Sequence, residues 1–283
     1  MRKFLAAALM AMASLVFAAS AVAAPHHPTG EWANFADCPL SNAKLEQCVY
    51  SVTTGGSVTL GKKTVPIEHP VILQGGFEGA GSGIKFYGAE DGNTLSKTPQ
   101  AVPGGLAGLV NCKEISNFLV RLSCEVTFEN GLTGVNATLE LAAPATSIKL
   151  NTENLLFEEG TALELPVKVH LENPFLGSNC YVGSNAAPIV VPLTTGTSGK
   201  LTGTSGEISF NKTFDRTIIK KSVLVNNTIA APGASGCGGP IVELLINPII
   251  NSQIGLPAGS GTNAVTLKAE LETGAAKSVK ASE

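Results

Sequence analysis

Charged and aromatic residues are scarce in this chain. Asp, Glu, Lys and Arg make up 14% of the 283 residues, the aromatic residues make up 5%, and the net charge is −3. Lysines and arginines do not gather into a basic cluster, and nucleic acids and anionic membranes bind through such clusters. We therefore expect no nucleic-acid partner.

Motifs for metals and cofactors are also missing. The six cysteines form no C-x-x-C pair, and the four histidines lie outside the short spacings that zinc sites use. No nucleotide-binding motif and no assembled nucleophile appears. The sequence predicts no cofactor and no metal, and it favours a protein without catalytic activity.

The one long apolar run lies at the start of the chain. "MRKFLAAALMAMASLVFAASAVAAP" combines a basic start, an apolar stretch and small residues in an A-x-A pattern, as in a secretory signal peptide. Cleavage after Ala23 or Ala24 removes Arg2 and Lys3, which leaves 17 Lys and Arg against 22 Asp and Glu, a net charge of −5. We expect a secreted mature chain, extracellular or bound to the cell envelope, without a transmembrane segment.

All six cysteines follow this segment, at Cys38, Cys48, Cys112, Cys124, Cys180 and Cys237. An even number of cysteines behind a signal peptide indicates disulfides, because the exported side is oxidising. Fifteen connectivities are open, and the spacing favours nearest neighbours: Cys38 with Cys48, Cys112 with Cys124, and Cys180 with Cys237. In the loop-closure model, the two short loops contribute about 3 kcal/mol each and the long one about 4 kcal/mol.

Apolar and polar residues alternate with a period of two in several segments. "FLVRLSCEVTFE", "LELPVKVHLE", "VNATLEL" and "AVTLKAELE" (118–129, 163–172, 135–141 and 264–272) each place apolar side chains on one face and polar ones on the other. This pattern predicts antiparallel strands with one face in solvent.

Clusters rich in Gly, Thr and Ser separate these segments. "TTGGS" (53–57) and "TTGTSGKLTGTSG" (194–206) are examples of predicted turns. Two stretches, 104–116 and 241–253, predict short helices, and Pro248 should break or kink the second. The sequence thus predicts an all-β protein, an antiparallel β-sandwich of one or two units with few short helices.

The predicted organisation has five parts. A signal peptide (1–24) precedes a small N-terminal β region (25–90), a linker (91–105), a larger β-sandwich domain (106–273) and a frayed polar tail (274–283). The linker lacks alternation and is rich in turn formers, which indicates a boundary.

Five segments carry a resemblance to other proteins. "FADCP", "TVPIEHPVILQGG", "VPGGLAGL", "LPVKVHLENPFLGSNCYVGS" and "APGASGCGG" together resemble a group of secreted actinobacterial proteins without an assigned function. The resemblance implies an exported, disulfide-linked protein, and it implies no catalytic or binding residue.

"GASGCGGP" (233–240) is one residue away from the string around the nucleophilic serine of trypsin-like proteases. Cys237 interrupts its glycine pair, and neither His69 nor His170 lies in the sequence context of a protease base. We interpret the string as a turn that positions Cys237. A protease or esterase that uses Ser235 is the third-ranked hypothesis.

Two further sets of residues could serve a ligand. Glu158, Glu159, Glu164 and Glu172 are carboxylates that a glycosidase could use as a pair. Trp32 and Tyr181 are candidate ligand-binding aromatics for a sugar, although packing beside a disulfide also explains them.

The leading hypothesis is a secreted, non-catalytic β protein with a binding or structural role at the cell envelope. Its partner would be a cell-wall polymer, a glycan or another protein. The alternative is a carbohydrate-active enzyme with a carboxylate pair.

Overall fold

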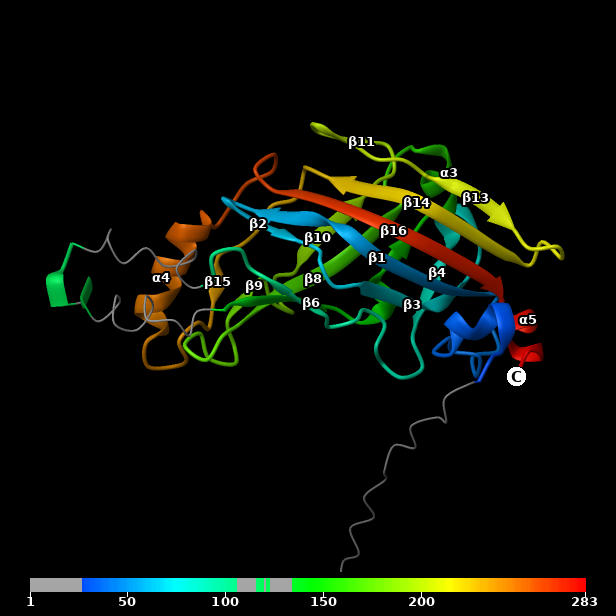
Figure 1. Cartoon of the computed structure of the whole chain (residues 1–283), viewed down its shortest axis with the longest axis horizontal. Coiled ribbons are helices and arrows are strands. Elements are labelled where there is room, and N and C mark those ends of the chain that lie inside the picture. Colours follow the sequence, from blue (N-terminus) through cyan, green and yellow to red (C-terminus); the bar gives the residue numbers. More distant parts are fainter. Residues whose placement is uncertain (1–26, 106–115, 120, 123–133) are drawn as a thin grey trace, which may run out of the picture.

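The structure is a computed structural model that describes residues 27–105, 116–119, 121–122 and 134–283. Two antiparallel sheets pack face to face as the two layers seen in Figure 1. One buried core contains residues from both sheets. The predicted all-β sandwich with few short helices is therefore confirmed.

The first sheet has the strand order β13-β14-β16-β1-β3-β4, and β2 pairs with the second half of β1. Its strands are β1 (Gln47–Leu60), β2 (Lys63–Pro66), β3 (Val71–Glu78), β4 (Lys85–Gly88), β13 (Glu207–Phe210), β14 (Arg216–Asn226) and β16 (Ala264–Ala275).

The second sheet has the order β15-β9-β8-β6-β5, and β7 and β10 also pair with β8. Its strands are β5 (Pro99–Ala101), β6 (Asn136–Leu141), β7 (Lys149–Leu150), β8 (Leu163–Glu172), β9 (Tyr181–Val182), β10 (Ile189–Leu193) and β15 (Ala234–Ser235). A separate hairpin joins β11 (Thr197–Ser198) to β12 (Leu201–Thr202).

The helical elements are short and lie at the margins of the sandwich. Those whose residues are all described are the 3-10 turns η1 (Gly30–Phe35), η2 (Gly81–Gly83) and η4 (Ala145–Ser147) and the α-helices α3 (Thr152–Phe157), α4 (Glu243–Ile254) and α5 (Ala276–Ala281). Helix α4 covers one end of the sandwich in Figure 1, and α5 lies at the other.

Three of the predicted strands are present. Strand β8 has the predicted bounds, and its odd-numbered residues from Leu165 to Leu171 are buried. Strands β6 and β16 lie where the alternation placed them, and β16 extends to Ala275. The fourth prediction, 118–129, is wrong for Phe118, Leu119, Arg121 and Leu122, which are helical, and its other residues lie outside the described ranges.

The first sheet joins the two regions that the sequence analysis divided. Strands β1 and β3 come from residues 25–90, and β1 pairs with β16, from residues 106–273. Residues 91–105, the predicted linker, carry the chain from β4 in the first sheet to β5 in the second.

The predicted turn "TTGGS" is part of β1 instead. The strand remains paired with β16 because a bulge between Thr53 and Gly55 absorbs the irregularity. Gly56 has φ +105°, and a Cβ there would lie 2.0 Å from the Thr266 carbonyl oxygen. Glycine therefore permits two central strands to approach where another residue would separate them.

The predicted frayed tail is ordered. Ala275 ends β16, and α5 follows it with Val279 fully buried beside the Cys38–Cys48 disulfide. The Thr29 hydroxyl donates to the Ser282 carbonyl oxygen (2.7 Å), so η1 (blue in Figure 1) and α5 (red) lie side by side. Burial of Val279 on the inner face of α5 is therefore enough to order this segment, although its composition is polar.

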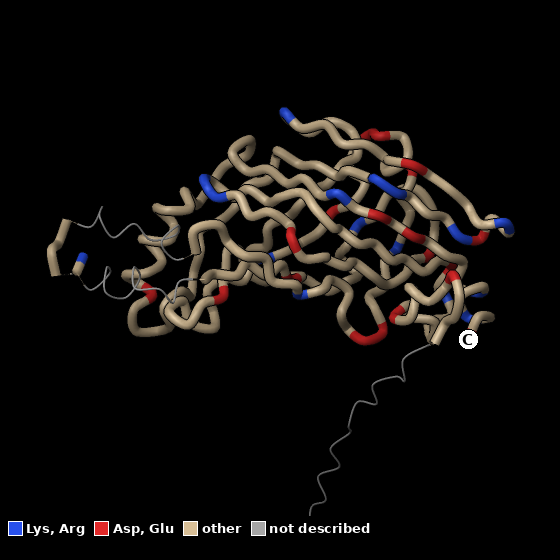
Figure 2. The backbone as a smooth tube through the Cα atoms, in the orientation of Figure 1, with Lys and Arg blue, Asp and Glu red and all other residues tan. Residues whose placement is uncertain are grey.

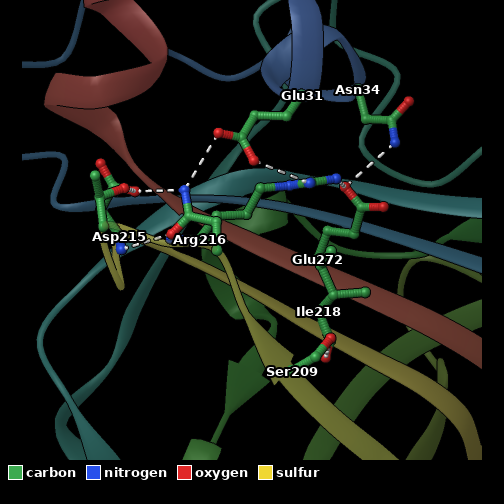
Figure 3. A network of polar contacts seen from close by, with 9 residues as sticks. Glu31, Asn34, Ser209, Asp215, Arg216, Ile218 and Glu272 are labelled. Carbon is green, nitrogen blue, oxygen red and sulfur yellow. Dashed lines mark hydrogen bonds and ion pairs between the residues drawn. The ribbon is translucent and has the colours of Figure 1, made fainter.

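A polar network fastens η1 to the first sheet (Figure 3). Arg216 on β14 donates from Nη2 to Glu272 of β16 (2.7 Å) and lies 3.5 Å from Glu31 of η1. The Asn34 amide also donates to Glu272 (3.3 Å). The guanidinium is largely buried, at 13% exposed, so the two carboxylates supply its counter-charge.

Next to this network, Asp215 accepts three side-chain hydrogen bonds. Ser278, Thr213 and Asn211 donate to its two oxygens at 2.5, 2.5 and 2.8 Å. These donors, Ser278 first, favour the ionised form and lower the pKa of Asp215 from 3.8 to about 2.

Two of the three predicted disulfides are confirmed. Cys38 bonds to Cys48, and Cys180 bonds to Cys237. Cys112 and Cys124 lie outside the described residues. The "GASGCGGP" turn positions Cys237 as expected: a Cβ at Gly236 would lie 2.1 Å from the Asn179 carbonyl oxygen, next to the partner Cys180.

Helix α4 is held to this turn by two asparagines one helical turn apart. Asn247 accepts from the Cys237 N–H (3.0 Å), and Asn251 exchanges two hydrogen bonds with the Ala234 backbone (2.6 and 3.0 Å). The helix predicted over 241–253 is present, and of the two expected effects of Pro248 the break does not occur, because α4 continues through it. Its last turns bury Ile250 and Ile254 against the core.

Replacing Gly56 with alanine should lower the free energy of unfolding by at least about 2 kcal/mol, because Cβ would collide with the β16 backbone. Urea unfolding of Gly56→Ala measures the change. Gly83→Ala is the control, since a Cβ at Gly83 meets nothing within 4 Å. Equal effects of the two substitutions would contradict the close approach.

Stability should fall in acid partly through Asp215. Its folded-state pKa is depressed, so its contribution is fully present above the ordinary value of 3.8 and is lost as the pH falls toward 2. Melting temperatures measured from pH 5 to pH 2 should therefore fall less steeply for Asp215→Asn than for the unsubstituted protein. Asp91→Asn, at an exposed turn, is the control, and parallel curves for all three proteins would refute this assignment.

Candidate functional site

A cavity of about 140 Å³ lies between the two sheets. Of the described residues that line it, 19 are apolar and five are polar or charged. An apolar cavity of about this size stays dry and admits a molecule as large as benzene. The interior of the sandwich therefore has room for an apolar ligand.

The cavity follows the strands. On β1 its wall extends from Ser51 to Leu60, ten residues, or about 30 Å of strand. Leu73, Leu139 and Leu163 face the interior yet are only half-buried, because part of their surface borders the cavity. Because the cavity is long but small in volume, it must be narrow. Such a space suits a linear ligand better than a broad ring system.

The five polar lining residues are Ser51, Thr53, Lys63, Thr98 and Gln100. Thr98 shares a hydroxyl contact of 2.9 Å with Ser96. The hydroxyls of Ser51 and Thr53 make no side-chain hydrogen bond within the described ranges. Two groups in the wall could thus bond to a polar atom of a ligand.

Gln100 closes one edge of the cavity. Its Oε1 accepts from the backbone N–H groups of Glu68 and His69 (2.9 and 3.0 Å), and its Nε2 donates to the His69 carbonyl oxygen (2.8 Å). Gln100 lies on β5 and its partners follow β2, so one buried side chain joins the edge strands of the two sheets.

Lys63 is the one charged residue in the described lining. It lies at the start of β2, opposite Leu60 of β1. Figure 2 shows Lys and Arg mixed with Asp and Glu along the described chain rather than gathered on one face. The cavity therefore carries a single positive group in an otherwise uncharged wall.

A second polar cluster lies on the outer face of the second sheet, on β6, β8 and β9. His170 Nδ1 lies 3.7 Å from Glu140 and 3.9 Å from Glu172, and Lys168 lies 3.5 Å from Glu140. The Tyr181 ring stacks on His170 (4.4 Å between centroids) below Lys168. Burial, then Glu140 and Glu172, raise the pKa of Tyr181.

The Lys168 ammonium and the Glu140 carboxylate of this cluster pair with each other. Lys168, His170 and Glu140 are only 15–17% exposed, so the face of β8 expected to be in solvent is covered by its own polar neighbours. The described residues contain no group of three or more His, Cys, Asp or Glu positioned for a metal. The cluster is an ion-pair network that holds the outer face together.

Ser235 lies in the same row of this sheet. It pairs with Tyr181, which pairs with His170, so Tyr181 separates the serine from the histidine. Two strand spacings, about 9.6 Å, exceed the reach of a hydrogen bond. His170 therefore does not activate Ser235, in agreement with the interpretation of the string as a turn.

The predicted carboxylates do not converge. Glu158 accepts from the Ser205 N–H and from the hydroxyls of Thr204 and Ser205, and these bonds lower its pKa. Glu164 pairs with Lys149 (2.6 Å), Glu172 accepts from the Thr138 hydroxyl, and Glu159 is exposed. The carboxylate pair of a glycosidase stays a prediction that no described contact favours.

Of the predicted aromatics, Trp32 lies in η1 and Tyr181 in β9, and neither lines the cavity. Trp32 packs on Phe35 in the small cluster around Cys38–Cys48. Tyr181 follows Cys180 and stacks on His170. A role for either aromatic in ligand binding stays a prediction.

Sequence reasoning missed Lys63, Gln100, Ser51 and Thr53. A signal was present for the lysine: in "KTVPI", alternation places Lys63 on the apolar face with Val65 and Ile67. No such signal marked Ser51, Thr53 or Gln100, because these residues reach the same cavity only through the pairing of distant strands.

No protein-family model, curated protein or solved structure matches the chain. Among the described residues, no helix has both the length and the apolar character required to cross a membrane.

Replacing Gln100 with leucine should lower the free energy of unfolding by about 2 kcal/mol, because backbone groups of Glu68 and His69 lose their partner. Urea unfolding measures the loss. Thr98→Val removes one hydroxyl contact in the same wall, and it should lower the free energy of unfolding by less than half as much. An equal or smaller cost for Gln100→Leu would show that Gln100 does not hold the edge.

Proposed function

We propose that the protein is an exported, non-catalytic binding protein that holds an apolar ligand in the cavity between its two sheets. The observation that carries this proposal is the elongated cavity with its predominantly apolar wall. Ligand pockets are commonly apolar with a few polar groups that fix orientation. Ser51, Thr53 and Lys63 would serve as those groups here.

The energetic cost of the cavity supports a binding role. At about 24 cal/mol per Å³, an empty space of 140 Å³ lowers stability by about 3 kcal/mol relative to a filled core. Larger side chains at Ala137 or Ala269 could fill part of it. A ligand would recover the lost contacts when it binds.

Other features of the chain support a site of action at the cell envelope or outside the cell. The predicted signal peptide and the two disulfides, Cys38–Cys48 and Cys180–Cys237, support export to an oxidising compartment. We therefore place the binding function at the envelope or outside the cell.

The oxidised mature protein should bind 1-octanol, a neutral molecule with a single alkyl chain. At ten times its Kd, free octanol should add about 1.4 kcal/mol to the free energy of unfolding. Ala137→Leu and, separately, Ser51→Leu should fill the cavity from opposite sheets and abolish this increment. Titration calorimetry and thermal unfolding measure both effects.

Ala281→Leu is the matched control, because it adds the same atoms on the exposed side of α5. It should bind octanol like the unsubstituted protein. Absence of octanol binding, or equal binding in all four proteins, would contradict a ligand in the cavity.

A further inference from the structure

Strand geometry directs the Lys63 side chain to the cavity. Residues 63, 65 and 67 share one face, and Val65 and Ile67 also line the cavity. Thr64 faces outward, where its hydroxyl lies 2.8 Å from that of Thr59. The pairing of Lys63 with Leu60 fixes this register, so the lysine is held on the inner face.

Within the described residues, no carboxylate forms an ion pair with Lys63 and no side chain accepts a hydrogen bond from it. Other half-buried cations in the described structure have partners: Lys168 lies 3.5 Å from Glu140, and Arg216 lies 2.7 Å from Glu272. The Lys63 side chain is half-buried against the apolar wall, and no described carboxylate lies beside its ammonium group to offset the charge. An anion at the cavity would supply the missing counter-charge.

We infer that the ligand is a single-chain amphiphile with an anionic head, and that Lys63 binds the head while the alkyl chain enters the cavity. This inference rests on the proposed function. The chain would extend along β1 toward Ser51, away from the charge. The edge strand β2 leaves Lys63 in reach of water, where a charged head is tolerated.

Three octyl compounds with one chain and different heads test the inference: octanoate, 1-octanol and octyltrimethylammonium, each below its micellar concentration. Calorimetric titration of the oxidised mature protein should show octanoate binding about tenfold tighter than octanol. The cationic compound should bind most weakly. Equal affinity for octanoate and octanol would overturn the inference.

Lys63→Met should weaken octanoate binding about tenfold, to the level of octanol, and leave octanol unchanged. Lys63→Arg should keep the preference for octanoate. Lys62→Met is the control, because Lys62 is exposed and does not line the cavity. If Lys63→Met does not fold, Lys63→Gln replaces it with the same expected result.

The failures of the two proposals are distinct. If octanol does not bind, the cavity is not a ligand site and both fall. If octanol binds but the octanoate preference is absent or survives in Lys63→Met, only the role of Lys63 falls. If the Lys63→Met protein dimerises and still prefers octanoate to octanol, the role of Lys63 is instead to protect the edge of the sheet from pairing with a second copy.

Discussion

The antiparallel pairing of β1 with β16 spans twelve residue pairs and forms the middle of the first sheet. One strand comes from the beginning of the described chain and the other from its end; the Gly61 N–H donates to Asn263, 202 residues later. Strands β2 and β3 pair with β1, and β14 pairs with β16; β4 and β13 are then added at the edges by pairing with β3 and β14. Closing so long a loop costs entropy, which the long ladder and its buried face offset.

The same pairing shapes the interior. Strand β1 is long enough to pair with β3 along its first half and with β2 along its second. Strand β5, at the edge of the second sheet, meets the β2 edge through Gln100. The space between β1 and the second sheet is lined by leucines and valines too small to fill it.

The alternation of apolar and polar residues was sufficient to predict a strand where one face is buried and the other is polar. Strand β8 could be predicted to the residue, and its cysteine neighbours paired as expected. The local sequence pattern gave wrong predictions where long-range contacts determine the structure. "TTGGS" is a strand because β16 pairs with it. The polar C-terminal segment is ordered because Val279 fits beside a disulfide.

The candidate site was invisible in the sequence for the same reason. Its wall combines residues from β1, β2, β5, β6, β8 and β16, and no local motif marks a space between strands. Composition did limit the choices, since the mild acidity and the lack of a lysine and arginine cluster argued against a basic binding surface. Only Lys63, an inward lysine in an alternating strand, could have been noticed beforehand.

Diffraction from crystals pressurised with xenon tests the central claim most directly, because xenon enters apolar cavities that exclude water. An apolar cavity between the sheets predicts anomalous xenon peaks between β1 and β8, near Leu73 and Leu165. Side chains packed through this space, or ordered water in place of xenon, would contradict it.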